Sequence, residues 1–461
     1  MEYGLAEYAV NLARRHGADY AEALLEHSIS VSQGSDQGVP NGSTSIKTNG
    51  IRVRIVKAKR LYTFSTNELD KSAISDMVAG ARPFTGSDIS LSREKRAKAK
   101  SFIREKRVVR EEDMESDITE MDRSLSKIKW IKYRSIYATF GRTMRYFTNS
   151  DGSDIETSTP FVDAYASITV GSGRRSRETM AQAGCVGGYE SFDVEAFSDD
   201  VMERAKGIKK VIDRGIEMKP AEISAIKNVV VSPEIVGIAA HESVGHPCEA
   251  DRVFGREAAQ AGTSYITKDN LRMSVGSKAV TIIDDPTLQE KSGFYMYDDE
   301  GIKSAPKVLI EKGRQKELLL DRNYAHVLGM KSNGSSRSSS YSNEPLIRMS
   351  NTYMKKGRAS FDELIEEAHS GVYIKSFAEW NIDDTRTFSR YQGNEAYLIK
   401  NGELSRPVVN YRLEKPTLEF WHAVSMVAND LEFYVGECGK GEPTQGIPVT
   451  MGGPSALLTF S

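Results

Sequence analysis

The feature that most constrains this chain is an apolar segment at residues 229–251, VVVSPEIVGIAAHESVGHPCEAD. Ser232 followed by Pro233 predicts the start of a helix, because serine caps helix N-termini and proline suits the first turn. The next residues are mostly isoleucine, valine and alanine, which gives the helix a buried face. A helix of this kind is expected to carry His241 and Glu242 into the interior of the protein.

The two histidines of this segment, His241 and His246, are one residue further apart than those of the H-E-x-x-H motif of metalloproteases. Residues four apart on an α-helix differ by about 40° around its axis, so both histidines of that motif face one metal ion. Residues five apart differ by about 140°, so on a regular helix the second points away. A π-bulge would absorb the extra residue. Gly245 makes such a distortion easy, and Pro247 is expected to move His246 out of the helical backbone region.

Two histidines and a glutamate in this arrangement suggest a metal centre. Neutral imidazoles of His241 and His246 are suited to bind Zn²⁺. Glu242 follows the first histidine directly, where it can accept a proton from a metal-bound water and later donate it to a leaving amine. A catalytic zinc also needs a third protein ligand and one open position. The alternative is a pair of structural histidines without metal, and the spacing alone leaves both interpretations open.

Composition sets only broad limits on partners and location. The chain has 461 residues, enough for two or three domains, with 62 basic and 64 acidic residues. This balance gives no reason to expect a nucleic-acid partner. No stretch reaches the roughly 18 apolar residues of a membrane span, and the start does not resemble a signal peptide. We therefore expect no membrane partner and a cytoplasmic location.

The cysteines are sparse and odd in number. Cys185, Cys248 and Cys438 are the three in the chain, which argues against a disulfide framework. Each is then a buried apolar residue, a reactive thiol or a metal ligand, and buried packing is the default role. We assign that packing role to Cys185 and Cys248.

The first half of the chain, residues 1–221, is predicted to be an α/β domain. Helical periodicity and strand-like alternation of apolar residues both occur in it. The expected helices lie near the N-terminus, at 71–81 and at 193–215. A strand is expected at 18–33, a hairpin at 48–67, and further strands over 131–195 with a turn at 149–152.

The second half, residues 222–461, is predicted to be a β-rich domain that carries the motif helix. After that helix the chain holds mostly strand-like runs separated by turns. Gly215 and Pro220 mark the boundary between the halves. An acidic cluster at residues 298–300 is expected in a turn or capping role. The predicted fold class of the whole chain is α+β.

A charged segment at about residues 91–130 divides the first half. It holds nine basic residues between Arg93 and Arg110 and then turns acidic. A nucleic-acid-binding arm is one interpretation. We favour a solvated helix with mixed ion pairs, because the basic and acidic blocks nearly cancel.

Several short motifs occur in an order that is similar to one family over nearly the whole chain. In the first half they are ADYAEALLEHSIS, TNGIRVRIV, TFSTN and NSDG; in the second half they are HESVGHPCEAD, YDDEG, LLLDRNYAHVLGMKSNGSSR, MSNTYM, NEAYLIKNGELSRPV and CGKGEPTQGIPVTMGGPSALL. Each motif alone is weak evidence, but their shared order is strong evidence. The chain resembles the TldD/PmbA family, described as modulators of DNA gyrase and now regarded as metalloproteases. The resemblance implies the fold of that family.

Within the family the chain resembles the TldD type, which carries HExxxH and a late cysteine, rather than the TldE/PmbA type, which lacks the histidine motif. The resemblance implies that His241, His246 and Cys438 bind zinc. It also implies that Glu242 is the catalytic base. A thiolate is a strong zinc ligand, and Lys440 would favour the thiolate form. The tail after the second histidine, PCEAD, departs from the small residues more common in the family, which leaves the end of the helix open.

The resemblance further implies a zinc-dependent peptidase that hydrolyses unfolded or short peptides inside the cavity of a dimer. The dimer is either a homodimer or a heterodimer with a TldE/PmbA-type chain. Extended substrates can be held by strand addition. Two alternatives stay open. One is a non-catalytic peptide-binding subunit with structural zinc, against which Glu242 argues because a structural site needs no base. The other is a zinc amidase acting on a small amide.

Overall fold

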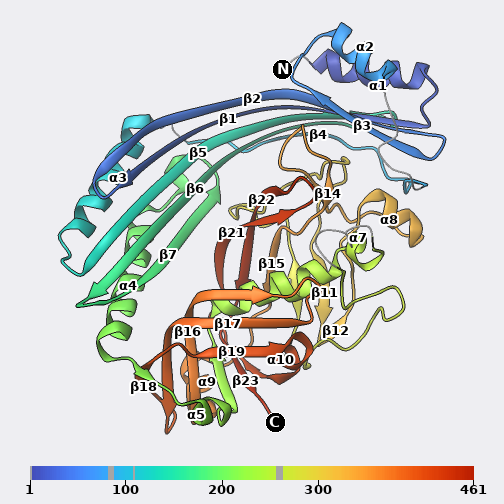
Figure 1. Cartoon of the computed structure of the whole chain (residues 1–461). Helices are drawn as coiled ribbons and strands as arrows, with labels where there is room; N and C mark the ends of the chain where they lie inside the picture. The colour runs from blue at the N-terminus through green and yellow to red at the C-terminus, as the bar shows by residue number, and fades with distance from the viewer. Residues whose placement is uncertain (1–2, 81–87, 107–109, 256–262) are drawn as a thin grey trace.

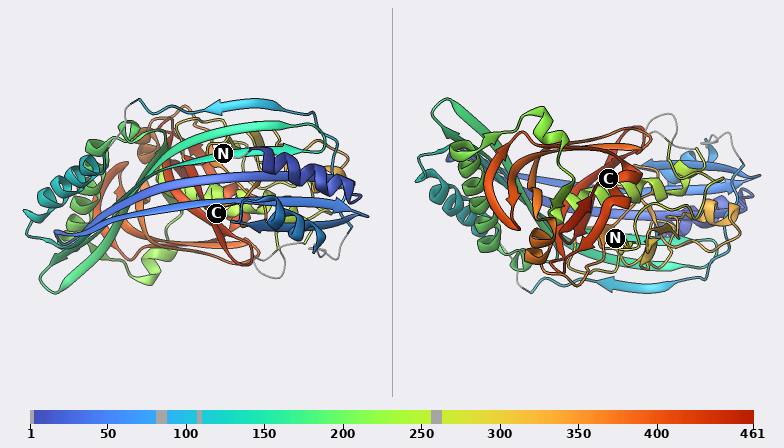
Figure 2. Two further views of the ribbon diagram at one scale, coloured as in Figure 1. Left: turned by 90° about the horizontal axis from the view of Figure 1, so that it is seen from above. Right: turned by 90° about the horizontal axis from the view of Figure 1, so that it is seen from below.

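The computed structural model describes residues 3–80, 88–106, 110–255 and 263–461. The N-terminal half forms a long curved sheet, which arches over the strands and loops of the C-terminal half (Figure 1). Seen from above, the long blue and teal strands lie in front of the orange and red strands, and seen from below they lie behind them (Figure 2). The N-terminus lies on the outside of the arch, and the C-terminus lies at the far end of the C-terminal half (Figure 1).

The N-terminal sheet is mainly antiparallel. Its strands are β1 (Tyr20–Asp36), β2 (Val39–Lys57), β3 (Arg60–Thr66), β4 (Lys98–Phe102), β5 (Ile131–Asn149), β6 (Asp154–Ser172) and β7 (Arg175–Val186). They lie in the order β3-β2-β1-β5-β6-β4, with β7 also paired to β6. Neighbours are antiparallel except for β4 and β6. The prediction of an α/β domain is therefore wrong in its strict sense: this half lacks parallel βαβ units among its described residues, and the α+β class fits it.

Helices pack against both ends of this sheet. They are α1 (Tyr3–Arg15), α2 (Lys71–Ala79), α3 (Glu111–Ser126) and α4 (Val194–Arg214). α1 and α2 lie on the outer face near one end, and α3 and α4 lie near the other (Figure 1). The predicted N-terminal helix and the helices at 71–81 and 193–215 are confirmed, with Asp193 and Gly215 capping α4. Ala81 lies outside the described residues.

The charged segment at 91–130 differs from the predicted helix. Residues 98–102 form β4, an edge strand paired with β6, and α3 covers only the acidic part. Lys98 and Lys100 occupy alternate, exposed positions of β4. Lysines on an edge strand stay in solvent and discourage further strand pairing, so a charge-dense sequence suits an edge strand as well as a helix. Residues 107–109 lie outside the described residues.

Strands dominate the C-terminal half, as predicted. One sheet has the order β12-β11-β10-β15-β22-β21, another has the order β20-β23-β9-β16-β17-β18-β8 with β19 paired to β17, and β13 pairs with β14. The strands are β8 (Ile216–Glu217), β9 (Asn228–Val231), β10 (Ile282–Asp284), β11 (Lys307–Glu311), β12 (Arg314–Gln315), β13 (Ser336–Arg337), β14 (Leu346–Ile347), β15 (Asn351–Met354), β16 (Ser370–Ile382), β17 (Phe388–Lys400), β18 (Glu403–Val409), β19 (Arg412–Pro416), β20 (Val424–Val427), β21 (Glu432–Lys440), β22 (Gln445–Gly453) and β23 (Ala456–Thr459).

One buried helix of this half contacts both of its larger sheets. The helices are α5 (Pro220–Ser224), α6 (Pro233–Ala240), α7 (Ala250–Val253), α8 (Arg322–Val327), α9 (Phe361–Ala368) and α10 (Thr417–Ala423). α6 packs against β15, β21 and β22 of one sheet and β16 of the other. Gly237 permits this packing, because a Cβ there would lie 2.9 Å from the backbone nitrogen of Gly452. α6 therefore packs closely against β22.

Buried ion pairs join the two halves. Arg52 on β2 and Arg145 on β5 both reach Asp299, at 3.3 and 3.0 Å. Arg54 on β2 pairs with Glu300 at 3.2 Å. These carboxylates belong to the acidic cluster for which the sequence predicted a turn or capping role. They also hold the N-terminal sheet onto the C-terminal half.

The connection between the halves runs through β8. This strand pairs with β18, so the chain enters a C-terminal sheet directly after α4. The division into domains 1–221 and 222–461 stays a proposal. Within the described ranges, no helix is both long enough and apolar enough to cross a membrane.

Candidate metal centre

The helix that bears the two histidines begins as the sequence predicts. Oγ of Ser232 accepts a hydrogen bond from the backbone N–H of Ile235 and caps α6. After α6, residues His241–Gly245 form a π-helical turn, in which the N–H of His246 donates to the carbonyl oxygen of His241. The predicted π-bulge is therefore confirmed. It brings two residues that are five apart onto one face of the helix.

Side chains from other elements stabilise the π turn through Ser243. Its hydroxyl donates to the carbonyl oxygen of Ala239 at 2.6 Å and accepts from Nε1 of Trp421 at 2.8 Å. The hydroxyl of Tyr265 donates to the carbonyl oxygen of Ser243 at 2.8 Å. A π turn interrupts the regular helical hydrogen bonds, and buried polar groups without partners cost free energy. These contacts supply partners where the turn departs from α-helical geometry.

The prediction that Pro247 moves His246 out of the helical region is wrong. His246 keeps helical dihedral angles, φ −57° and ψ −45°. Pro247 lies in the first turn of a short 3-10 helix, residues 246–248. An N–H at this position has no partner within the helix, so proline removes no hydrogen bond there. The backbone leaves the helical region at Glu249, with φ −72° and ψ 120°. The helix end that the sequence left open therefore follows Cys248.

Gly245 has a packing role rather than the conformational role predicted for it. Its φ of −57° and ψ of −59° are available to any residue. A Cβ at this position would lie 1.8 Å from Sδ of Met349, which is fully buried. Glycine suits this position because Met349 fills the space beside it.

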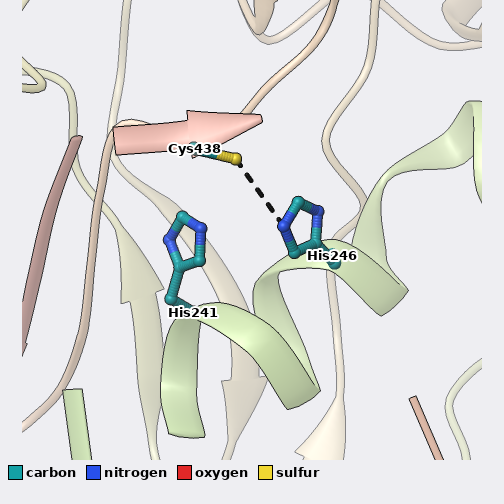
Figure 3. A group of neighbouring side chains, drawn as sticks. All are labelled: His241, His246 and Cys438. Carbon is teal, nitrogen blue, oxygen red and sulfur yellow. Dashed lines mark hydrogen bonds between the residues drawn. The ribbon is translucent and has the colours of Figure 1, made fainter. Parts of the chain in front are cut away.

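The third residue of the site comes from the far end of the chain. Cys438 lies on β21, and Arg348 donates a hydrogen bond to its carbonyl oxygen. Sγ of Cys438 is 3.6 Å from Nε2 of His246. The ligand atoms of His241, His246 and Cys438 all lie within 4.8 Å of one another. Figure 3 shows the two rings and the sulfur gathered around one space. Each of these residues is at most 3% exposed.

The chemistry of these three groups suits a metal ion. Burial lowers the pKa of both His241 and His246, so their rings are neutral near pH 7 and have a nitrogen lone pair available. Burial alone would raise the pKa of the Cys438 thiol, but His246 and Arg348 outweigh it, and the pKa is lowered. Nδ1 of His241 is buried and has no hydrogen-bond partner among the described residues. Two imidazoles and a thiolate are a donor set that zinc prefers.

Glu242 lies beside this cluster. Its Oε2 is 3.9 Å from Nε2 of His246, and its side chain is 11% exposed. Nη1 of Arg386 pairs with the same oxygen at 2.8 Å. Sequence analysis missed Arg386, because its 144-residue separation from Glu242 leaves no local signal.

A buried group of charges supports the second histidine. Nδ1 of His246 is 3.0 Å from Oε2 of Glu249, and Nε of Arg252 donates to the same oxygen at 2.7 Å. Lys440 pairs with Glu249 at 3.1 Å and with Asp251 at 2.7 Å. Lys440 is therefore held by carboxylates, and the charges that lower the pKa of the Cys438 thiol most are those of His246 and Arg348 rather than the predicted Lys440. Sequence analysis also missed Glu249; its signal is the acidic tail directly after the motif.

The other two cysteines are free thiols. Cys248 is fully buried in the core of the C-terminal half, which confirms its predicted packing role, and burial raises the pKa of its thiol. Cys185 is half-buried beside the core under α3 and α4, where burial raises its pKa to about 11.

A cavity of about 560 Å³ lies between the N-terminal sheet and the hairpin of β21 and β22. Successive residues of a strand point to opposite faces, so Cys438 faces the metal cluster and its neighbour Glu437 lines the cavity. Asp163 on β6 also lines it, and burial together with Glu437 raises the pKa of that carboxyl to about 6. Among the described residues, the lining includes neither His241 nor His246, so this cavity is separate from the metal cluster.

The sequence is similar to those of known metallopeptidases. Residues 225–460 match the family described as PmbA/TldA metallopeptidase C-terminal domain. A metalloprotease of Methanothermobacter thermautotrophicus is 30% identical over 442 residues, which cover 94% of this chain and 91% of that protein. A protein of Saccharolobus solfataricus named zinc metalloprotease TldD homolog is 34% identical over 227 residues, which cover 49% of this chain and 48% of that protein.

Solved structures share the whole fold. A Thermotoga maritima protein described as a modulator of a DNA gyrase has a TM-score of 0.79 at 16% identity and covers 100% of this chain and 99% of its own. TldE from Thermococcus kodakarensis has a TM-score of 0.75 at 15% identity, and the match covers 99% of this chain and 100% of TldE. The TldD/PmbA-like fold implied by the motifs is confirmed. With a family match over the C-terminal half and a relative that spans most of the sequence, the chain belongs to the PmbA/TldD family of metallopeptidases.

Proposed function

We propose that this metallopeptidase depends on zinc and hydrolyses unfolded or short peptides. In this proposal His241, His246 and Cys438 are the metal ligands, and Glu242 is the general base. The convergence of three buried N, N and S ligand atoms beside one glutamate is the observation that carries it. The relative named a zinc metalloprotease supports the choice of metal. Three protein ligands is the number expected of a catalytic zinc, which keeps one position open, whereas a structural zinc has four.

The position of Glu242 supports the proposed role in proton transfer. Its carboxylate lies close to the second histidine, so a water molecule beside the ligands is within its reach. It accepts a proton from the attacking water and later donates it to the leaving amine. Zinc, when bound, polarises the scissile carbonyl and makes water a stronger nucleophile near neutral pH. The buried surroundings strengthen each of these electrostatic interactions.

The strand that carries Cys438 offers a way to hold an extended peptide. β21 is the last strand of its sheet, so the backbone groups on its outer edge are not used by that sheet. A peptide that adds to this edge would run past Cys438 and thus past the metal ligands. Strand addition requires an extended chain and tolerates varied side chains. We therefore propose unfolded or short peptides as the substrate class.

We also propose that the active assembly is a dimer, formed by two copies or with a TldE-type chain. The similarity of the fold to TldE and the resemblance to the TldD type support this assembly. A dimer would enclose the site further and would restrict access to flexible chains. The cytoplasmic location expected from the sequence stays a prediction.

Elemental analysis of the purified protein beside Cys438→Ser tests the metal site. We expect about one zinc per chain in the wild type and none in the variant, because serine is a much weaker zinc ligand than a thiolate. Circular dichroism checks that both proteins are folded. A folded wild type that takes up no zinc, even after zinc is supplied, would show that the two histidines are not ligands together.

Hydrolysis of unfolded casein by the wild type and by Glu242→Gln tests the catalytic role. We expect the variant to keep its zinc and to lose kcat by at least about 100-fold, since general acid–base catalysis contributes roughly 10²–10⁴-fold. Cleavage by Glu242→Gln at the wild-type rate would show that another group is the base.

A further inference from the structure

Arg386 forms the closest charged contact of the proposed base. Its Nη1 lies 2.8 Å from Oε2 of Glu242. The side chain of Arg386 is 15% exposed and that of Glu242 is 11% exposed, so solvent and salt screen the pair less than they screen a surface pair. Charge-assisted hydrogen bonds of this length are among the stronger contacts in proteins. The pair is therefore well suited to fix the orientation of the carboxylate.

The loop that carries Arg386 is held on two sides. It comprises residues 383–387 and joins β16 to β17. Within the loop, the carboxylate of Asp383 accepts a hydrogen bond from the hydroxyl of Thr387 at 2.9 Å. From α10, Oγ1 of Thr417 donates to the carbonyl oxygen of Arg386 at 2.6 Å. These contacts anchor the backbone from which the arginine reaches the site.

The backbone of Arg386 has an uncommon conformation. Its φ is +62°, in the left-handed region that residues other than glycine rarely adopt. Such a conformation costs free energy and persists where the surroundings determine it, often at functional sites. Nε of Arg386 is also buried without a hydrogen-bond partner among the described residues. Arg386 therefore keeps an unfavourable backbone conformation and an unpaired Nε while its Nη1 contacts Glu242.

We propose that Arg386 is a positioning residue: it holds the carboxylate of Glu242 beside His246 in the orientation that proton transfer needs. This inference rests on the proposed function. An unrestrained glutamate populates several rotamers, and restricting it to the reactive rotamer during the reaction costs conformational entropy. A contact that selects one rotamer in advance removes that cost from the reaction. The hairpin of β16 and β17 thereby contributes to catalysis through Arg386.

The test compares Arg386→Ala and Arg386→Lys, each in the wild-type and the Glu242→Gln background. Arg390→Ala is the matched control, because Arg390 lies on β17 of the same hairpin and pairs with Glu379, not Glu242, in a solvent-exposed contact. Bound zinc and circular dichroism are measured for every variant. Arg386→Lys keeps a cation at this position, and it keeps the proposal testable if the alanine variant does not fold.

With casein as substrate, we expect Arg386→Ala to lower kcat about 100-fold with little change in KM, since a misplaced catalytic group costs on this order. Arg386→Lys should recover part of that loss, and Arg390→Ala should match the wild type. In the Glu242→Gln background, Arg386→Ala should have no further effect. A normal kcat in Arg386→Ala, or losses that simply add in the double variant, would overturn the proposal.

A second readout does not depend on turnover. The visible absorption spectrum of the Co²⁺-substituted protein responds to the groups arranged around the ion. We expect Arg386→Ala to change this spectrum when Glu242 is present and to leave it unchanged in the Glu242→Gln background. An unchanged spectrum, or a change that persists without Glu242, would overturn the positioning role. If the wild type does not cleave casein, the proposed function fails, and the spectrum alone decides the role of Arg386.

Discussion

At the scale of single residues, two glutamates lie beside the candidate metal ligands, and each of them is paired with basic side chains. Glu242 is held by Arg386, and Glu249 is held by Arg252 and Lys440. Glu249 in turn contacts the ring nitrogen of the second histidine that faces away from the cysteine. Carboxylates in this position fix the tautomer and orientation of metal-binding histidines. The candidate site thus has an outer layer of charged side chains that contact one another and the second histidine.

Glu249→Gln tests the role of this outer layer. We expect zinc affinity to fall roughly 10–100-fold, because the amide keeps the size of the side chain but loses the charge that orients His246. Competition with a chelator at pH 7 measures the affinity. Glu437→Gln is the control, since Glu437 adjoins Cys438 but faces the cavity on the other side of β21. Equal affinity of Glu249→Gln and the wild type would show that this contact does not orient the ligand.

At the same scale, the sequence identified the candidate ligands but not the residues that hold them. His241, His246 and Cys438 stood out because a rare spacing and a family resemblance marked them. Arg386 could not be found this way, because a contact across 144 residues exists only after the hairpin and the motif helix have packed. The sequence predicts that Lys440 favours the Cys438 thiolate, but strand alternation does not show that Glu249 and Asp251 pair with its ammonium group.

At the scale of elements, the π turn explains how HExxxH can serve as a metal motif. The prediction of the turn followed from helix geometry, because one extra residue between two ligands must be absorbed somewhere. The roles of Pro247 and Gly245 could not be predicted as well. Proline fits the 3-10 turn that follows, and glycine is needed because Met349 packs against it. Both reasons depend on tertiary neighbours rather than on local preference.

Gly245→Ala tests the packing around the π turn. We expect it to lower the free energy of unfolding by about 1–3 kcal/mol, since overpacking a core costs this much, and to weaken zinc binding by displacing His246. Met349→Ala in the same chain should restore zinc binding, because it removes the atoms that clash. Gly4→Ala in α1 is the control, because open space surrounds that position. If Met349→Ala gave no recovery, the clash with Met349 would not be the reason for glycine.

At the scale of the whole molecule, two halves meet through buried ion pairs and a cavity. The sequence predicted the α+β class, most of the strands and the order of the halves, because apolar periodicity is local. It could not predict that Arg52 and Arg145 would share Asp299, nor that β4 would be an edge strand. Alternating lysines fit both a strand edge and a helix face, and only the pairing with β6 decides between them.

Asp163, in the cavity between the halves, makes the stability of the whole molecule depend on pH. The pKa of Asp163 is raised to about 6, whereas aspartate in an unfolded chain titrates near 3.9. Between these values the folded state binds the proton more tightly, so the free energy of unfolding falls as pH rises, by up to about 3 kcal/mol in total. Asp163→Asn removes this dependence. Urea unfolding measures the free energy of unfolding of Asp163→Asn minus that of the wild type. This difference should rise by roughly 2–3 kcal/mol from pH 4 to pH 7 and then stay level. A difference that does not vary with pH would mean that the two halves leave Asp163 as solvated as in the unfolded chain.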